Sequence, residues 1–292
     1  MRSLLFVPAD SEKKLSRGLE SGADVLIVDL EDSVSLPAKE KAREMAAAFI
    51  AHNRLRPSPT IYVRVNDLAT GLTDDDLNGI VSARPAGIML PKCNGGEDAG
   101  RLSVKLRVAE AEAGIPDGSI RVIPLITETA MGVLSAGTYA NPDPRIQALS
   151  WGAEDLSAAI GARASRDESG RLTDVYRLAR AMTLLAASAA EVAALETVFP
   201  DFRDLEGFRR FCVEAERDGF TGCMAIHPAQ VSVINEVFTP SQEAVEEAQA
   251  LIAAFEAEGN PGVVAIGGKM YDRPHLRRAE NLLRRAIRPV GS

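Results

Sequence analysis

The chain has 292 residues, 46% of them hydrophobic, a formal net charge of −8 and three cysteines. The length suits one large α/β domain, or one domain with an appendage. The acidic balance, with no cluster of Lys and Arg before the last predicted helix, argues against a nucleic-acid surface. No apolar stretch is long enough to span a membrane. Because Cys93, Cys212 and Cys223 lack the spacing of metal ligands, we expect reduced thiols in a cytoplasmic protein.

Short apolar runs alternate with amphipathic segments, which is typical of a parallel sheet with helical crossovers. The expected strands are residues 3–7, 25–30, 60–65, 87–90, 121–127, 146–151, 194–198 and 223–226. The expected helices are residues 11–21, a segment starting near Pro37, and residues 74–82, 97–113, 156–160, 176–190 and 205–218. Residues 161–174 are a polar insertion. Eight strand–helix units predict an α/β fold, the (β/α)8 TIM barrel.

The chain continues beyond the eighth strand with a helix at 241–258, a short strand at 263–266, a Gly-rich turn at 267–274 and a basic helix at 275–287. This is more than a complete barrel needs. We therefore expect a catalytic barrel domain over residues 1–238. Residues 239–292 would form a C-terminal helical extension that packs on another part of the assembly, such as a neighbouring subunit.

Two of the predicted strands run into acids. Glu128 follows the fifth strand, and Glu154 and Asp155 follow the sixth. In an α/β barrel the C-terminal ends of the strands form the active face, and two acids there make a hard-oxygen site suited to Mg²⁺. The alternative is that Glu154 or Asp155 caps the following helix, since helix N-termini favour acids.

Acids dominate at the strand ends, with one arginine and one lysine, and no Ser or Cys nucleophile is paired with a His in an obvious motif. Metal-assisted chemistry on a small acid is therefore favoured. Glu128 and Asp155 would bind a divalent cation that polarises a 2-oxo acid and stabilises an enolate. Arg64 would donate to a carboxylate or a developing oxyanion. Lys92 could form a Schiff base, although loop contacts are the favoured interpretation.

Glu31 and Asp32 follow the second predicted strand. For both residues, helix capping or support of the metal ligands is favoured over direct binding of the metal. An ion pair between Arg64 and Glu31 or Asp32 is the alternative to substrate binding by Arg64, and both can hold because a carboxylate would orient the arginine. His227, before Pro228, is favoured as a structural hydrogen-bonding group.

Eight motifs, in this order along the whole chain, resemble the citrate lyase β-subunit-like proteins, which include the malyl-CoA and citramalyl-CoA lyases within the HpcH/HpaI aldolase group. The motifs are RSLLFVP from Arg2, VDLED from Val28, VRVN from Val63, LPK from Leu90, TETA from Thr127, GAEDL from Gly152, AIHP from Ala225 and GKMYDRPH from Gly268. The resemblance implies a Mg²⁺-dependent barrel that cleaves or forms a C–C bond. Its partners would be an acyl-CoA thioester and a 2-oxo acid such as glyoxylate or pyruvate.

The resemblance also implies roles for individual residues. Glu128 and Asp155 match the metal ligands, and Arg64 matches the arginine that holds substrate oxygens. Asp272 matches a tail carboxylate that enters the active site of an adjacent subunit and handles a proton, which implies a homo-oligomer, often a trimer or hexamer. The expected catalytic residues are Arg64, Asp272, Glu31 and Asp32, and the expected substrate-binding residues are Arg64, Lys92, Gly152, Ala153 and Glu154.

The leading hypothesis is a lyase acting on a β-hydroxyacyl-CoA such as malyl-CoA or citramalyl-CoA. The family often has Arg where this chain has Met131, and its relatives include malyl-CoA thioesterases. The alternatives are therefore a thioesterase, a citrate lyase β subunit that works on citryl groups with an acyl-carrier partner, and a non-catalytic barrel.

Overall fold

The computed structural model describes residues 1–286, which fall into two compact units, Met1–Asn235 and a second unit from Glu236 onward. The predicted division into residues 1–238 and 239–292, and the packing of the second part on a neighbouring subunit, stay predictions.

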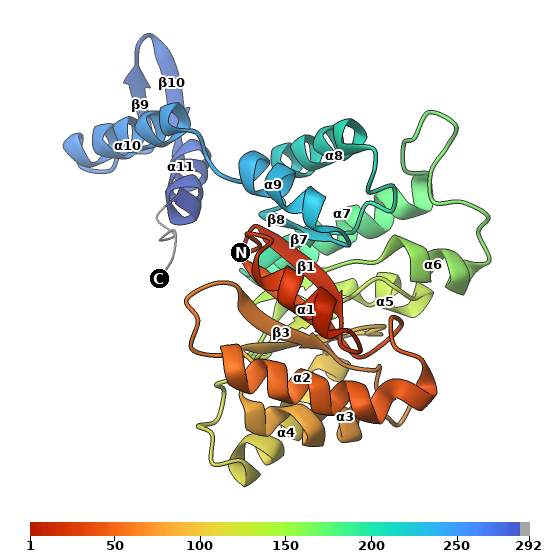
Figure 1. Ribbon diagram of the computed structural model, residues 1–292. Helices are drawn as coiled ribbons and strands as arrows, with labels where there is room; N and C mark the ends of the chain where they lie inside the picture. The colour runs from red at the N-terminus through yellow and green to blue at the C-terminus, as the bar shows by residue number, and fades with distance from the viewer. Residues whose placement is uncertain (287–292) are drawn as a thin grey trace. The chain divides into compact units, whose positions relative to one another are not determined.

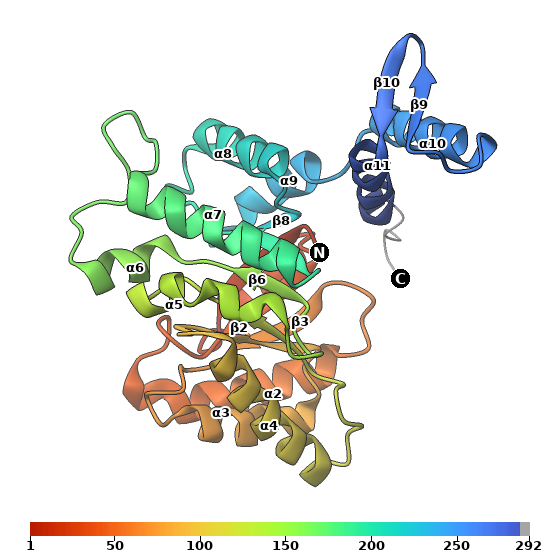
Figure 2. The ribbon, with the colours of Figure 1, turned by 180° about the vertical axis from the view of Figure 1, so that it is seen from behind.

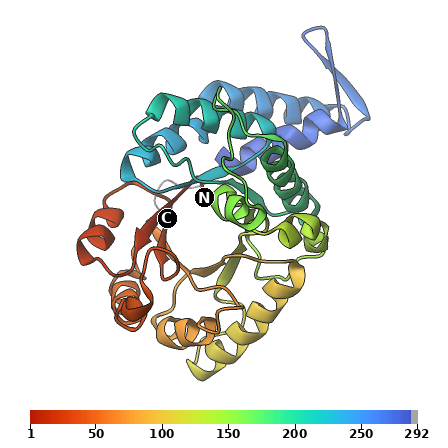
Figure 3. The ribbon, with the colours of Figure 1, turned by 90° about the vertical axis from the view of Figure 1, so that its right-hand side faces the viewer.

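Eight parallel strands form the first unit in the hydrogen-bonded order β5-β4-β3-β2-β1-β8-β7-β6. Parallel bridges from Val122 to Ile146 and from Leu125 to Ser150 join the two ends of this order, so the strands surround a common axis (Figure 3). The strands are β1 (Ser3–Pro8), β2 (Val25–Asp29), β3 (Thr60–Arg64), β4 (Gly87–Leu90), β5 (Arg121–Pro124), β6 (Ala148–Ser150), β7 (Ala193–Glu196) and β8 (Gly222–Ala225). The predicted (β/α)8 barrel is confirmed.

Helices cover the outside of this barrel (Figures 1 and 2). They are α1 (Glu12–Leu19), α2 (Lys39–Asn53), α3 (Thr73–Ile80), α4 (Gly96–Glu112), α5 (Ala130–Leu134), α6 (Ala153–Ile160), α7 (Asp174–Ala189), α8 (Leu205–Asp218) and α9 (Pro228–Val237), with short 3-10 turns at Leu36–Ala38, Val81–Ala83 and Ala136–Ala140. The helices α5 and α9 and the turn after α5 were not predicted from the sequence. The five residues of α5 are too few to show a helical period.

Alternate residues of the strands fill the barrel. The interior cluster includes Leu4, Val25, Ile27, Tyr62 and Met89. Gly87 lies against Tyr62, because a Cβ at residue 87 would be 2.1 Å from Tyr62 Cε1. Since side chains alternate along a strand, the next inward positions after Ile27 and Tyr62 are Asp29 and Arg64. The alternation that places apolar side chains in the core therefore also directs the Asp29 carboxylate and the Arg64 guanidinium into the barrel.

The second unit has its own small core. Helices α10 (Gln242–Ala257) and α11 (Arg273–Ala286) pack around the antiparallel hairpin of β9 (Val263–Ile266) and β10 (Lys269–Asp272). Phe255, Val264 and Leu276 form this core.

The prediction of one Gly-rich turn over residues 267–274 is wrong for most of that range. Gly267 and Gly268, both with positive φ, are enough to connect a hairpin, and the residues after them pair as β10. The predicted end of the last helix, Ile287, lies outside the described residues. No helix within residues 1–286 is long and apolar enough to cross a membrane.

Candidate active site

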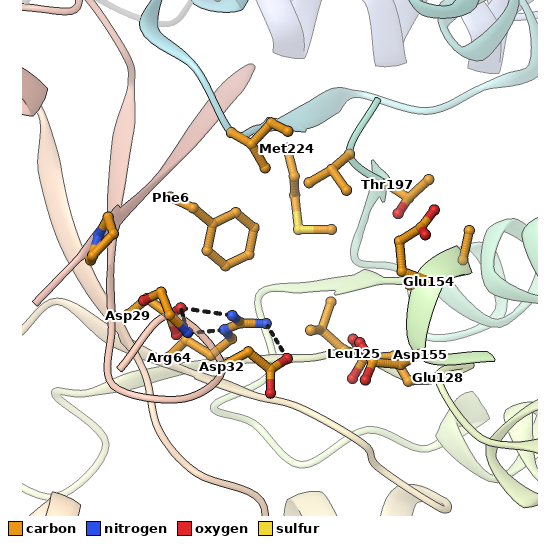
Figure 4. A pocket seen from close by; sticks show the side chains of 16 residues that line it. Phe6, Asp29, Asp32, Arg64, Leu125, Glu128, Glu154, Asp155, Thr197 and Met224 are labelled. Carbon is orange, nitrogen blue, oxygen red and sulfur yellow. Dashed lines mark hydrogen bonds and ion pairs between the residues drawn. The ribbon is translucent and has the colours of Figure 1, made fainter. Parts of the chain in front are cut away.

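A pocket of about 430 Å³ opens at the carboxyl ends of the barrel strands (Figure 4). Acids from three strand–helix junctions, one arginine and several apolar side chains line it. The lining consists of Phe6, Pro8, Asp29, Asp32, Ser33, Arg64, Leu125, Glu128, Gly152, Ala153, Glu154, Asp155, Thr197, Val198, Met224 and Ile226. The pocket lies on the face where barrel enzymes carry their active sites.

Asp29 and Arg64 face each other across neighbouring strands. They are register partners of β2 and β3. Arg64 Nε and Nη2 donate to Asp29 Oδ1 and Oδ2, each at 2.7 Å. Burial acts to raise the pKa of Asp29, but the bonds from Arg64 outweigh burial and hold this pKa below its usual range. Asp29 is therefore a fixed anion that sets the plane of the guanidinium, and the ring of Phe6 lies 4.8 Å from the guanidinium carbon.

Glu31 joins Arg64 to Lys92. Its Oε2 lies 2.9 Å from Arg64 Nη1, and its Oε1 accepts a hydrogen bond from Lys92 Nζ. Burial raises the pKa of Glu31 to about 7, although both cations act to lower it. The predicted ion pair of Arg64 with Glu31 is present, whereas the Oδ2 of Asp32 is 3.9 Å from Nη1.

Lys92 does not line the pocket. Its Nζ is 3.4 Å from Asp155 and 3.6 Å from Asp32. Burial acts to lower the pKa of Lys92, but the bond to Glu31 outweighs it, so the pKa is raised. A Schiff base needs a neutral amine, and the carboxylates around Lys92 stabilise the ammonium instead. This environment disfavours the Schiff-base alternative.

Glu128 lies in the loop after β5 and Asp155 in the first turn of α6, and the two side chains lie close together (Figure 4). Glu128 is 3% exposed and accepts the Lys92 backbone N–H at 2.6 Å. Burial, followed by the charge of Asp155, raises the pKa of Glu128 to about 8. Gly152 makes room for this carboxylate, since a Cβ there would be 2.6 Å from Glu128 Oε1.

The capping alternative is wrong for the acids after β6, and none of the three predicted site acids serves as an N-cap. Thr129 caps α5 by accepting the Gly132 N–H at 2.9 Å. Gly152 occupies the N-cap position of α6, and Glu154 and Asp155 lie in its first turn. The carboxylates are thus free of a capping bond and face the pocket.

The residues fit a magnesium ion. Two neighbouring carboxylates that repel each other are stabilised by a cation. Within residues 1–286, no group of three or more His, Cys, Asp or Glu side chains is placed to hold a metal. Mg²⁺ is commonly held by one or two carboxylates and keeps positions for water and substrate oxygens. The pair Glu128 and Asp155 matches this need.

A buried network of hydrogen bonds holds the loop after β2, and it was not predicted from the sequence. Lys39 Nζ donates to the carbonyl oxygens of Leu30 and Glu31 at 2.6 and 2.8 Å, and to Asn66 Oδ1 at 2.7 Å. Asn66 in turn donates to Asp76 at 2.7 Å. Asp29 was not predicted as a site residue, because it ends an otherwise apolar strand. An acid at the end of such a strand is the feature that could have indicated its role.

Asp272 and His227, which were singled out from the sequence, are not in the lining of the pocket. Asp272 is in the second unit, half exposed, and pairs with His275 Nδ1. This bond lowers the pKa of Asp272. His227 Nδ1 accepts the Ala229 N–H at 3.2 Å and its ring stacks on Phe202. His227 therefore has the structural role that was favoured from the sequence.

A family model described as HpcH/HpaI aldolase/citrate lyase matches residues 2–228. The chain belongs to this family. A citrate lyase subunit beta-like protein of Mycobacterium tuberculosis is 35% identical over 97% of this chain and 94% of its own length. Mitochondrial citramalyl-CoA lyase of Rattus norvegicus is 33% identical over 97% of this chain and 85% of its own.

Solved structures agree with this membership of the HpcH/HpaI family. The CitE protein of M. tuberculosis in complex with magnesium, acetoacetate and coenzyme A has a TM-score of 0.76, 32% identity and 98% coverage of both chains. CitE has also been solved with magnesium and pyruvate, with a TM-score of 0.72 and 31% identity over 97% of both chains. The chain is a lyase of this family, and the expected cofactor, Mg²⁺, is the metal that these relatives hold.

Proposed function

We propose that this protein is a Mg²⁺-dependent lyase that cleaves or forms a short β-hydroxyacyl-CoA, such as malyl-CoA or citramalyl-CoA. The products of cleavage are an acyl-CoA and a 2-oxo acid, glyoxylate or pyruvate. One observation carries the proposal: Glu128 and Asp155 lie together in the same pocket as Arg64. The bound ion would polarise the oxygen of the 2-oxo acid and stabilise negative charge that develops there.

Arg64 is well suited to hold substrate oxygens. A guanidinium has five N–H donors, and Asp29 takes only two of them. Glu31 Oε2 lies 2.9 Å from Nη1, and the N–H donors that Asp29 and Glu31 leave over can bind a substrate carboxylate, while Asp29 keeps the group from rotating. Gly152, Ala153 and Glu154 at the start of α6 line the same pocket, and we assign them to substrate binding.

The cleavage needs a base and an acid. A carboxylate takes the proton of the β-hydroxyl group, the bond between the α and β carbons breaks, and its electron pair forms the enolate of the acyl-CoA. Glu31 and Asp32 are our candidates for the base, because they lie within the carboxylate group around Arg64 and Lys92. Asp272 of a neighbouring subunit is our candidate for the acid that protonates the enolate, in a homotrimer or hexamer.

Product analysis tests the proposal. The protein is incubated with Mg²⁺ and malyl-CoA or citramalyl-CoA, and the products are identified by mass spectrometry. Glyoxylate or pyruvate together with an acyl-CoA is the expected result. Malate or citramalate with free CoA would instead identify a thioesterase, and turnover that requires a carrier protein would identify a citrate lyase subunit. We expect the reaction to take place in the cytoplasm, which suits the three buried free cysteines.

A further inference from the structure

A second pocket lies at the other end of the barrel. It has a volume of about 300 Å³ and includes residues at the amino-terminal ends of β3, β4 and β5. These strands carry Arg64, Lys92 and Glu128 at or beyond their opposite ends. The second pocket is therefore separate from the candidate active site. Its lining is Ile50, Asn53, Arg54, Arg56, Pro59, Thr60, Ile61, Arg84, Pro85, Ala86, Ile115, Pro116, Ser119 and Ile120.

Three arginines line this pocket, and its lining contains no Asp or Glu. Among the described residues, no carboxylate forms an ion pair with Arg54, Arg56 or Arg84. By contrast, Arg64 and Arg145 are each held by buried acids. The second pocket is a concentration of positive charge that the protein itself does not neutralise.

Local backbone structure explains only part of this cluster. Arg54 and Arg84 follow the C-termini of α2 and of the turn Val81–Ala83, where carbonyl groups favour a cation. Arg56 lies two residues beyond the C-cap of α2, and its backbone N–H donates to the carbonyl oxygen of Asn53 at 3.0 Å. Arg84 has a φ of 64°, a conformation that favours Gly or Asn over an arginine. The end of α2 therefore favours cations at residues 54 and 56, but the left-handed backbone does not favour an arginine at residue 84.

We propose that this second pocket binds a small oxyanion with at least two negative charges, of the size of pyrophosphate or citrate. Each guanidinium presents paired N–H donors that match the oxygens of a phosphate or carboxylate. Ile61, Pro85 and Ile120 form apolar walls beside the three exposed arginines. A volume of 300 Å³ is at the small end of ligand pockets, so the ligand is a small molecule.

Calorimetric titration of the full-length protein with pyrophosphate, without Mg²⁺ and at low ionic strength, tests the inference. One saturable site is expected, and R56Q and R84Q are each expected to weaken binding roughly tenfold. The matched control is R17Q, which removes the same charge from an exposed position on α1 and is expected to leave the affinity unchanged. Thermal melts confirm that each variant is folded.

A second control separates the two pockets. Lys92→Gln removes a cation beside the candidate active site, and it is expected to leave pyrophosphate binding intact. Citrate as a second probe shows whether the site binds carboxylates as well as phosphates, and binding of either supports the inference. The inference is overturned if neither probe binds more tightly than about 1 mM, or if R56Q and R84Q bind as the parent does. Because binding is measured directly, the result is independent of the proposed lyase activity.

Discussion

The carboxylate of Asp29 accepts two hydrogen bonds from the guanidinium of Arg64, both 2.7 Å long, across adjacent strands of the barrel. Both side chains are largely buried, with exposed fractions of 2% and 12%. In a site of low dielectric, such a bidentate pair fixes direction as well as charge. In the proposed function, Asp29 thus holds Arg64 in position for a substrate oxygen.

Replacing Asp29 by Asn is the direct test of this positioning role. The loss of a buried counter-charge is expected to lower the free energy of unfolding by about 3 kcal/mol and to lower kcat/KM for the thioester. Denaturant unfolding and steady-state kinetics measure the two effects. Asp10→Asn, on an exposed residue after β1, is expected to change stability by less than about 0.5 kcal/mol. Full activity of the Asp29 variant would contradict the role.

Replacing Gly152 by Ala is expected to impair metal binding. The new Cβ would lie 2.6 Å from Glu128 Oε1 and 2.7 Å from its Cγ, so the carboxylate must move. The Mg²⁺ concentration for half-maximal activity is expected to rise at least about tenfold. Gly100→Ala on α4 is the matched control, because no atom lies within 4 Å of its Cβ position. An unchanged Mg²⁺ requirement in the Gly152 variant would place the metal elsewhere.

The buried pair of Glu110 and Arg145 is expected to make stability depend on acid pH. Glu110 accepts two bonds from Arg145, at 2.9 and 2.6 Å. Burial acts to raise the pKa of Glu110, but Arg145 outweighs it, so the pKa is lowered. A lowered pKa contributes stability that is present above the unfolded value, about 4.3, and is lost as the pH falls through the folded value.

Glu110→Gln isolates this contribution. The variant is expected to be about 2 kcal/mol less stable than the parent at pH 7, and the difference is expected to shrink below about pH 4.3. Urea unfolding at a series of pH values measures it. Glu112→Gln, an exposed neighbour on α4, serves as the control. A difference that grows with acidity would refute the assignment.

Co-expression of two impaired variants tests whether Asp272 acts between subunits. Asp272→Asn is expected to lower kcat with little change in KM, because the proposed role is proton transfer after substrate binding. Glu128→Gln is expected to abolish metal-dependent turnover. If the tail of one subunit serves the site of another, co-expression of the two variants restores part of the activity. Co-assembled variants that stay inactive would show that Asp272 does not serve a neighbouring subunit.

Much of the fold could be predicted because hydrophobic periodicity is a local property. The runs around Val25, Ile61 and Ile88 are apolar on both faces, as buried parallel strands require, and they are strands in the structure. The strand-end acids Glu128 and Asp155 were visible for the same reason. The short helix α5 and the hairpin strand β10 were missed, because a few residues carry too little periodicity to identify.

The sequence by itself determined the barrel, the family and the two acids that we assign to magnesium, since each depends on residue patterns along a short stretch of chain. Only the tertiary structure decided which charges meet. The register of β2 and β3 places Asp29 opposite Arg64. Two separate loops bring Arg54, Arg56 and Arg84 to the lining of one pocket. Such pairings follow from barrel closure and strand register, which depend on contacts between residues far apart in the chain.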